Sequence, residues 1–196
     1  MATSRENKSI SQFKSSLIGG GARPNLFEVE LTTLPAGISW NSENFRFMAK
    51  AAALPAQNIA AIDVPFRGRI FKVAGDRTID TWTVTIINDE SFELRNAMEQ
   101  WTEVIAKLDN NLGATDPSAY MTNAKVFQLG RGSSKSSKDS TGSSNAVLKE
   151  YEFVDIFPTT VSEIALSYDT GDTIEEFDVE FQVQSLNLTG TGSPNG

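Results

Sequence analysis

Two pairs of carboxylates are the residues whose types and spacing come nearest to a chemical function. Glu150 and Glu152 share one face of an expected strand, and Asp178 and Glu180 share a face of another. Glycosidase carboxylates stand about 5 to 9 Å apart, which same-face neighbours could meet. Alternating acids on a strand are more often its solvent-exposed face, so these pairs indicate catalysis only weakly.

The residues that most catalytic and metal sites require are missing. The chain has no histidine and no cysteine, which excludes a Ser-His-Asp triad, thiolate metal sites and disulfides. The turn from Asp169 to Asp172 lacks the spacing of an EF-hand loop. The run Gly19 to Gly21 is not followed by the lysine of a phosphate-binding loop. We therefore expect no enzyme activity, no metal and no cofactor.

Composition narrows the possible partners. The 196 residues suit one domain, and 17 basic against 25 acidic residues give a net charge of −8. This balance argues against a surface that grips nucleic acid or anionic membrane. The sequence has neither the apolar block of a signal peptide nor a run long enough for a membrane span. We expect no membrane anchor and a cytosol-like site of synthesis.

The stretch Asp76–Leu108 organises the rest of the chain. Thr81–Ile87 alternates, with Trp82 on the apolar face, which predicts a half-buried strand. Asn88–Ser91 supplies capping and acidic residues for a helix. An apolar stripe follows at helical spacing, formed by Leu94, Met98, Trp101, Ile105 and Leu108. The helix is therefore expected to pack on the Trp82 face of the strand.

Further strands are predicted by alternation and β-branched residues, and turn signals separate them. Ala74–Arg77 is expected to be a turn, and Pro158 is expected to end a strand. The fold class that follows is mostly β, an antiparallel sandwich or barrel with one flanking α-helix. The expected strands are Leu26–Leu31, Asn44–Lys50, Ile59–Val64, Arg69–Val73, Lys125–Leu129, Val147–Phe157, Glu163–Tyr168 and Phe177–Val183.

Three segments are expected to be mobile. Residues 1–21 form an arm, with a short amphipathic helix at Ser9–Ile18 before the glycine run. Residues 130–145 are rich in Ser, Gly and Lys and lack large apolar side chains, so a solvated loop is favoured over a nucleic-acid contact. Residues 189–196 form a tail. The domain between arm and tail, residues 22–188, leaves unpaired backbone groups at its sheet edges, which neighbouring copies could cover.

Several blocks of the sequence resemble the tail tube protein family of T-even-type phages. They follow in family order from residue 22 to about 188, and residues 130–145 stand out as an insertion. The block at Val73–Thr78 and the strand start at Trp82 are the most specific of them. The other blocks are Ala22–Glu30, Lys50–Ala56, Pro65–Arg69, Asn88–Glu90, Phe157–Val161 and Phe177–Val183.

This resemblance implies a structural role in a virion tail that is assembled in the host cytoplasm. Family members form homo-hexameric rings that stack into the inner tube of a contractile tail, and the joined sheets make one barrel around a lumen. The implied partners are the tail sheath, the baseplate and tail-terminator proteins, and DNA that passes through the lumen without being held. Genome ejection is the implied process, and the family has no catalytic residues.

Candidate site residues follow from combining the resemblance with the strand pattern. Acidic strand faces would repel the DNA polyanion, which makes Glu28, Glu30, Asp178 and Glu180 candidates for the lumen wall. Exposure on the outside of the tube remains the alternative for each strand. Ala49–Ile62 and the N-terminal arm are candidates for ring-to-ring stacking.

Four charged residues at strand ends are candidates for ion pairs between subunits. They are Arg23, Arg67, Asp76 and Arg77. Local salt bridges that brace turns are the alternative for each of them.

Other functions remain open at this point. The same fold would serve in the tube of a contractile injection system, such as a pyocin, a type VI system or an extracellular particle, and in baseplate proteins that initiate a tube. A monomeric β-sandwich binding module would instead require an exposed aromatic cluster. Electron microscopy of the purified protein distinguishes assembly from a monomeric module.

Overall fold

The computed structural model describes residues 10–17, 21–133, 145–169 and 171–189. These residues fall into two compact units. The larger unit comprises Glu28–Val126 and Tyr151–Thr189, and the smaller one includes the described parts of Met1–Phe27 and Phe127–Glu150. The core and the surfaces analysed below belong mainly to the larger unit.

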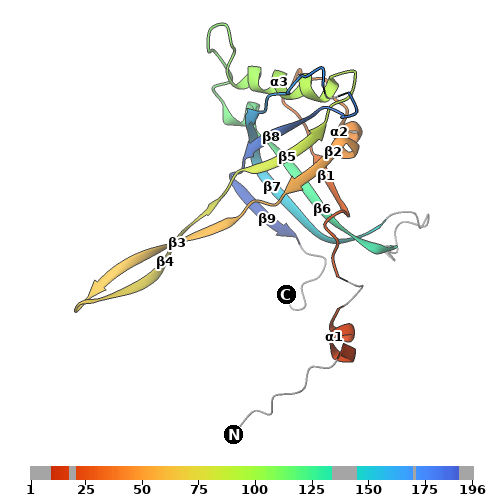
Figure 1. Ribbon diagram of the computed structural model, residues 1–196. Helices are drawn as coiled ribbons and strands as arrows, with labels where there is room; N and C mark the ends of the chain where they lie inside the picture. Colours follow the sequence, from red (N-terminus) through yellow and green to blue (C-terminus); the bar gives the residue numbers. More distant parts are fainter. Residues whose placement is uncertain (1–9, 18–20, 134–144, 170, 190–196) are drawn as a thin grey trace. The chain divides into compact units, whose positions relative to one another are not determined.

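The central element is a seven-stranded sheet with the order β1-β6-β7-β8-β5-β2, and β9 pairs with β7 beside this path (Figure 1). Strands β5 and β8 are antiparallel, with Trp82 opposite Phe181 and Ile87 opposite Glu176. The mostly β fold class with antiparallel pairing is therefore confirmed. The strands are β1 (Phe27–Leu31), β2 (Ala49–Ala53), β5 (Trp82–Ile87), β6 (Thr122–Ser133), β7 (Asn145–Val161), β8 (Glu176–Gln182) and β9 (Ser185–Thr189).

An aromatic cluster forms the core on one face of this sheet. Trp82 is fully buried and stacks on Phe153, with ring centroids 4.6 Å apart, and its ring lies 5.3 Å from that of Phe181. The alternating pattern of β5 is visible in its burial, because Trp82, Val84 and Ile86 are buried while the threonines between them are partly exposed. The interpretation of Trp82 as a core residue is confirmed.

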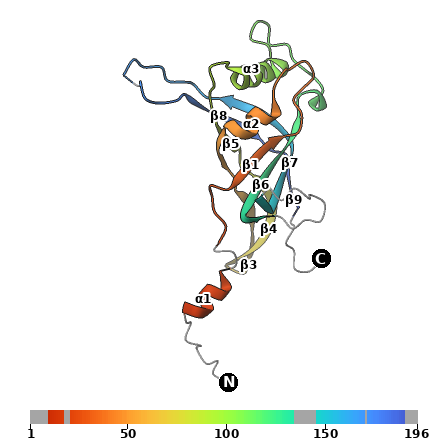
Figure 2. The ribbon, with the colours of Figure 1, turned by 90° about the vertical axis from the view of Figure 1, so that its right-hand side faces the viewer.

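Helix α3 (Glu93–Ile105) covers this core (Figure 2). Trp101 is buried 5.8 Å from the Phe181 ring, and its indole N–H donates to the Tyr120 carbonyl at 2.7 Å. Leu94 and Met98 are buried beside it, as the stripe predicts. The predicted extension to Leu108 is wrong, because the helix ends at Ile105 and Leu108 is exposed in the turn that follows.

The start of α3 also differs from the expectation. The N-cap is Phe92, in the left-handed region with φ 54°, and no side chain bonds to the cap. The hydroxyl of Ser91 lies 3.4 Å from the Glu93 N–H, and Asp89 accepts from that hydroxyl at 2.7 Å. The capping residues thus brace the turn before the helix and do not occupy the N-cap position.

The predicted strand Asn44–Lys50 is wrong, because helix α2 (Ser42–Met48) takes its place. The side chain of Asn41 caps this helix by accepting from the N–H groups of Glu43 and Asn44. Phe45 is fully buried, whereas Phe47 is largely exposed. Residues two positions apart share a face on a strand but point about 200° apart on a helix. The different burial of Phe45 and Phe47 therefore fits a helix.

Three further differences concern strand limits. Residues Glu163–Tyr168, predicted as a strand, lie in an irregular loop between β7 and β8. Pro158 does not end β7, because the strand continues to Val161 through a register shift at Pro158 and Thr160, where a proline needs no ladder donor. Strand β9 was not predicted.

Two short helical elements and parts of the segments expected to be mobile are also described. Helix α1 (Ile10–Ser16) lies within the predicted helix Ser9–Ile18, and η2 (Pro117–Ala119) is a single 3-10 turn. Part of the expected mobile loop 130–145 belongs to strands, since β6 reaches Ser133 and β7 begins at Asn145. Residues 1–9, 18–20, 134–144, 170 and 190–196, with most of the expected arm, loop and tail, lie outside the described residues.

Candidate assembly interface

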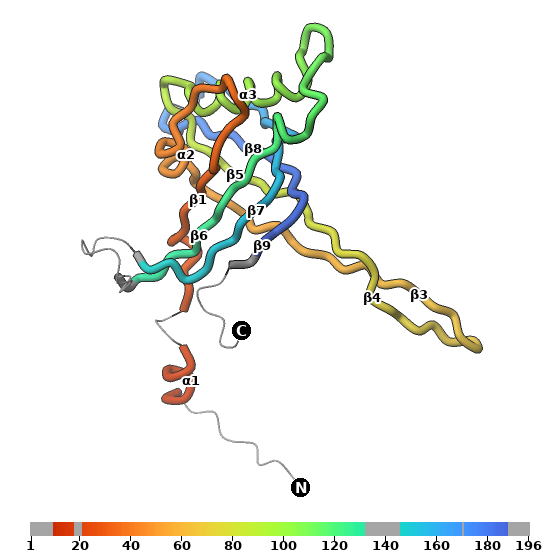
Figure 3. Tube along the Cα trace, turned by 180° about the vertical axis from the view of Figure 1, so that it is seen from behind, coloured from red at the N-terminus to blue at the C-terminus, as the bar shows by residue number. Residues whose placement is uncertain are grey.

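A long two-stranded hairpin leaves the sheet between β2 and β5 (Figures 1 and 3). Its strands are β3 (Gln57–Phe66) and β4 (Arg69–Ile79), and they pair only with each other among the described residues. Arg67 and Gly68 form the two-residue turn, with φ values of 45° and 80°. A two-residue turn with positive φ at both positions suits the right-handed twist of a hairpin.

The hairpin is longer than predicted. The expected turn Ala74–Arg77 is wrong, because these residues lie within β4. Gly75 sits beside a register shift at Ile59 and Ala61, and a Cβ there would meet the Ala60 carbonyl oxygen at 3.0 Å. Glycine at this position therefore allows close backbone approach at a bulge and does not end the strand.

The hairpin exposes an unusual amount of apolar surface. Every residue of β3 is exposed, and large apolar side chains on both strands reach solvent. Phe66 and Phe71 are each about two thirds exposed. An apolar, uncovered ribbon of this kind marks an interaction site in a soluble protein. The exposed apolar residues are Ile59, Ile62, Val64, Phe66, Ile70, Phe71 and Val73.

Three of the four predicted inter-subunit residues belong to this hairpin. Arg67 lies at its tip, with its guanidinium 5.4 Å from the centroid of the Phe66 ring. Asp76 and Arg77 are exposed near its base, and Arg77 donates to the Gln57 side chain at 3.4 Å. Among the described residues, no ion pair involves any of the three. The alternative of local turn-bracing salt bridges is thus not seen in these parts of the chain.

The fourth predicted residue, Arg23, is separate from the hairpin in sequence and belongs to the smaller unit. Its side chain is exposed, and its backbone carbonyl accepts from the Gln128 amide at 2.7 Å. The structure therefore groups Arg67, Asp76 and Arg77 on one element, whereas Arg23 belongs to the other compact unit.

The sheet has two outer strands, β1 and β2, at the ends of its strand order. Each has one neighbour within the sheet, β6 for β1 and β5 for β2. The other side of an edge strand presents unpaired N–H and C=O groups, which favour pairing with another chain. Together with the hairpin, these edges make the described part of the chain suited to assembly.

The predicted lumen residues lie on two different strands. Asp178 and Glu180 lie on β8 between the buried Phe177, Val179 and Phe181, so their side chains are on the face opposite the core. Thr85 is the cross-strand partner of Asp178 and donates to its carboxylate at 2.6 Å, and Thr83 is opposite Glu180. This face of β5 and β8 is polar, as predicted.

Glu28 and Glu30 lie on the edge strand β1, on either side of the buried Val29. Glu28 forms an ion pair with Arg46 of α2, while Glu30 is exposed. The structure thus keeps Asp178 and Glu180 together on a central strand and gives Glu28 a basic partner that offsets its charge.

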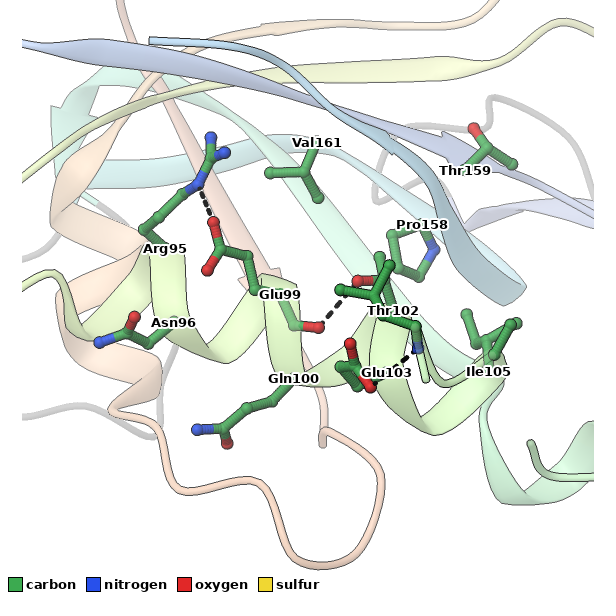
Figure 4. Close-up of a pocket in the computed structure, with 12 residues that line it drawn as sticks. Arg95, Asn96, Glu99, Gln100, Thr102, Glu103, Ile105, Pro158, Thr159 and Val161 are labelled. Atoms are coloured by element: carbon green, nitrogen blue, oxygen red, sulfur yellow. Dashed lines mark hydrogen bonds and ion pairs between the residues drawn. The ribbon is translucent and has the colours of Figure 1, made fainter. Parts of the chain in front are cut away.

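A groove of about 840 Å³ lies between α3 and the end of β7 (Figure 4). Its charged side chains are engaged within the chain. Arg95 donates to Glu99 at 2.6 Å and to the Ser162 carbonyl at 2.6 Å, and Glu103 accepts from the Leu108 N–H at 3.4 Å. The carboxylates of Glu99 and Glu103 are therefore held in contacts with nearby residues of the chain.

Two of the four other carboxylates considered for catalysis are also engaged. Glu152 accepts from the Asn187 side chain at 3.3 Å, and Asp178 accepts from Thr85. The described residues contain no cluster of three or more acidic, histidine or cysteine side chains that could hold a metal ion. None of the helices in the described ranges is long and apolar enough to cross a membrane.

Comparison with known proteins identifies the family. The family model described as phage tail tube protein matches residues 22–188. The chain belongs to the phage tail tube protein family. It is 38% identical over 161 residues to tail tube protein gp19 of Enterobacteria phage T4, an alignment that covers 82% of this chain and 88% of that protein. Tail tube protein gp19 of Enterobacteria phage T6 is 37% identical over the same length. As a tail tube protein, the chain is a structural component of the virion tail.

Solved structures confirm the fold. The chain is similar to the tube-terminating cap of the anti-feeding prophage, with a TM-score of 0.56, 14% identity, and coverage of 97% of this chain and 99% of that one. It is also similar to a chain of the PVC sheath–tube complex, an extracellular contractile injection system, with a TM-score of 0.55, 12% identity, and coverage of 93% and 99%. The tail tube fold is therefore shared across tubes of different devices.

Sequence reasoning named parts of the hairpin of this tail tube protein as contact candidates, Ala49–Ile62 and Arg67 among them, but missed that its apolar residues are exposed. The segment Ile59–Val73 was read as ordinary strands, although its apolar residues do not alternate strictly with polar ones. Apolar residues on both faces of a strand require cover on both sides. Since a tight Arg67–Gly68 turn pairs the two strands only with each other, this pattern could have indicated an arm that another molecule covers.

Proposed function

We propose that this chain is a subunit of the inner tube of a contractile phage tail. Six copies form a closed ring, and the rings stack into a hollow conduit. The subunit acts as a structural element without a catalytic step. The observation that carries the proposal is the hairpin β3–β4, whose apolar side chains are exposed in the single chain and would be covered in a tube.

Edge strands support ring closure. Strands β1 and β2 each have one open side within the sheet, and joining such edges between copies removes them without a new fold. When each copy binds its neighbour through two different surfaces, the ring closes if a whole number of the rotations between neighbours makes one full turn. Membership in the tail tube family supports six as the number of copies.

The N-terminal arm and the segment Ala49–Ile62 contribute to stacking of rings. Helix α1 has no buried residue, and Ile10 and Phe13 are exposed on it. A seven-residue helix with exposed apolar side chains is marginal by itself, so it gains order by docking on a neighbouring subunit. We propose that residues 1–21 act as this arm, that residues 22–188 form the tube domain, and that residues 189–196 follow as a tail.

The polar face of β5 and β8 lines the bore. Asp178 and Glu180 lie on this face, and neutral threonines flank them. Phosphate contacts to lysine or arginine would build affinity by releasing counterions and would slow the movement of DNA. A weakly acidic wall repels the polyanion, which permits DNA to pass during genome ejection. The sheath surrounds the tube, and baseplate and tail-terminator proteins meet its two ends.

Electron microscopy of the purified protein, with a baseplate template added where needed, tests this function. We expect hollow tubes of stacked sixfold rings, and double-stranded DNA within the bore of the native particle. Monodisperse monomers that never assemble on the template would contradict the proposal. Tubes whose native particles carry no DNA would instead indicate an injection device built on the same fold.

A further inference from the structure

The loop between β7 and β8 extends away from the sheet (Figure 2) and carries a second group of exposed apolar residues. The described loop residues are 162–169 and 171–175. Leu166, Tyr168 and Ile174 are all more than two thirds exposed, and Tyr168 makes no aromatic or hydrogen-bonding contact in the described part of the chain. Like the hairpin, this loop presents large apolar side chains that the sheet does not cover.

The loop and the hairpin carry opposite charges. The sequence from Ser162 to Glu175 contains four acidic residues and no lysine or arginine. The hairpin from Gln57 to Ile79 contains four basic residues against two acidic ones, in a chain whose net charge is −8. Charge complementarity of this kind steers association and fixes the register of an interface.

Several of these charges are unpaired in the part of the chain that the structure describes. Among the described residues, the charged groups of Arg69, Asp169 and Asp172 make no ion pair or hydrogen bond. The backbone N–H of Asp169 donates to the Ser167 hydroxyl at 3.2 Å, which leaves its carboxylate available. At the tip, the Arg67 guanidinium contacts the Phe66 ring and leaves its donors available. The charges most accessible to another molecule are therefore at the tip of the hairpin and in the middle of the loop.

The two surfaces leave the sheet at opposite ends of the same pair of strands. The hairpin joins β5 at Trp82, which pairs with Phe181, while the loop joins β8 at Glu176, which pairs with Ile87. Six residues of strand separate these ends, a distance of about 17 Å. Complementary surfaces at opposite ends of one subunit meet most simply when copies associate head to tail.

We propose that the hairpin β3–β4 of one copy docks on the β7–β8 loop of a second copy. Phe66, Ile70 and Phe71 pack on the apolar loop residues Leu166, Tyr168 and Ile174. Arg67 and Arg69 face Asp169 and Asp172, which sets the register. This contact rests on the proposed tube function, and it names the surface on a neighbouring subunit that the hairpin covers.

Cross-linking tests the contact directly, because the chain has no cysteine of its own. The double variant Pro65→Cys/Ala165→Cys, which changes exposed neighbours of Phe66 and Leu166 and keeps the packing residues, is assembled into tubes and treated with a short bismaleimide. Since each chain uses one surface for the copy before it and the other for the copy after it, we expect a ladder of covalent trimers and larger species on a denaturing gel. The matched control is Pro65→Cys/Gln100→Cys, whose second cysteine lies on the exposed side of α3, and it should give no ladder.

The outcomes separate the contact from the function. Tubes that form normally, with no more cross-linking than the control, would overturn the proposed contact and leave the tube function intact. Failure of the wild-type protein to form tubes with a baseplate template would count against the tube function itself. Cross-links of the hairpin to another protein, and none to the loop, would also overturn the contact.

A charge swap provides a second, independent test. We expect Arg67→Glu/Arg69→Glu and Asp169→Lys/Asp172→Lys each to reduce tube yield about tenfold or more, because like charges then face each other. The variant that carries all four changes should recover most of the yield, since the pair is restored with reversed sign. If the variant with all four substitutions assembles no better than either double variant, the contact is contradicted. Near-ultraviolet circular dichroism of the unassembled proteins must show that all three variants are folded.

Discussion

At the residue scale, the part-buried hydrogen bond of Trp101 ties α3 to the turn before β6. Its indole N–H donates to the Tyr120 carbonyl at 2.7 Å, and its ring packs 5.8 Å from Phe181. Trp101→Phe leaves that carbonyl without its partner and removes part of the ring, so we expect a loss of about 1–3 kcal/mol in the free energy of unfolding. Urea unfolding of the unassembled protein measures this loss.

Trp40→Phe is the matched control for this change. Trp40 is half-buried and contacts Phe45 at 5.3 Å between ring centroids, and no hydrogen bond of its indole is seen in the described residues. The control should change the free energy of unfolding by less than about 0.5 kcal/mol. Equal losses for the two variants would show that the Trp101 hydrogen bond contributes nothing specific.

Asp76 and Arg77 test the predicted ion pairs between subunits. Both side chains are exposed and make no ion pair in the described part of the chain. Asp76→Lys or Arg77→Glu should therefore leave the urea midpoint of the unassembled protein unchanged and strongly reduce the pelleted fraction in a tube sedimentation assay. Wild-type yields of tubes from either variant would remove these residues from the interface.

At the element scale, the same chemical change should have opposite effects in the hairpin and in the core. Phe66→Ser/Phe71→Ser alters exposed side chains. We therefore expect the free energy of unfolding to change by less than about 0.5 kcal/mol per site, while tube assembly fails. Phe153→Ser removes a fully buried ring that stacks on Trp82 and should lower stability by about 3–5 kcal/mol. Urea unfolding and sedimentation of the two variants separate these effects.

A hairpin variant that assembles as well as the wild type would show that the apolar arm is not needed in the tube. Marked unfolding of the same variant would show instead that the hairpin packs within its own chain. Either result would contradict the assignment of this element to contacts between copies.

Particular elements also show what the sequence can predict. Strand β5, helix α3 and strand β8 were predicted because period-two and helical patterns follow from one-sided burial, as at Trp82 and Phe181. Helix α2 was missed because Phe45 and Phe47 fit a strand equally well over so short a stretch, and only the Asn41 cap distinguishes them. In such a short segment the contacts with the rest of the fold determine whether a helix or a strand forms, and these contacts leave no periodic pattern in the sequence.

The candidate interface was predicted in part for a similar reason. Charged residues of the hairpin, such as Asp76 and Arg77, could be named from sequence although they lie within β4 and not at a strand end, as could the acidic face with Asp178. The exposure of Phe66 and Phe71 could not be named, because an apolar residue in a strand has the same sequence pattern whether its own core or another chain covers it. Only the isolated pairing of β3 with β4 distinguishes the two cases.

At the scale of the whole molecule, the charge of the bore controls the passage of DNA. Asp178→Lys/Glu180→Lys places cations on the polar face of β8, and we expect tubes of this variant to retain double-stranded DNA in a manner that weakens steeply with salt. Gln100→Lys/Glu103→Lys adds cations on α3, on the core side of the sheet, and serves as the control. Co-sedimentation of DNA with tubes at two salt concentrations measures retention.

Equal DNA retention by the two variants would contradict the assignment of Asp178 and Glu180 to the lumen wall. Greater retention by the α3 control would indicate that the helix faces the bore instead. Both tube preparations need the same length distribution, which electron microscopy establishes beforehand.

The central claim is that sister copies cover the apolar hairpin and the open sheet edges of each subunit. A cryo-electron microscopy reconstruction of the assembled protein tests this claim most directly. We predict stacked sixfold rings in which the hairpin β3–β4 of every copy is seated on another copy and strands β1 and β2 meet neighbouring chains. A resolved particle in which each chain stands apart, with its hairpin in solvent and no copy beside its sheet edges, would contradict the account.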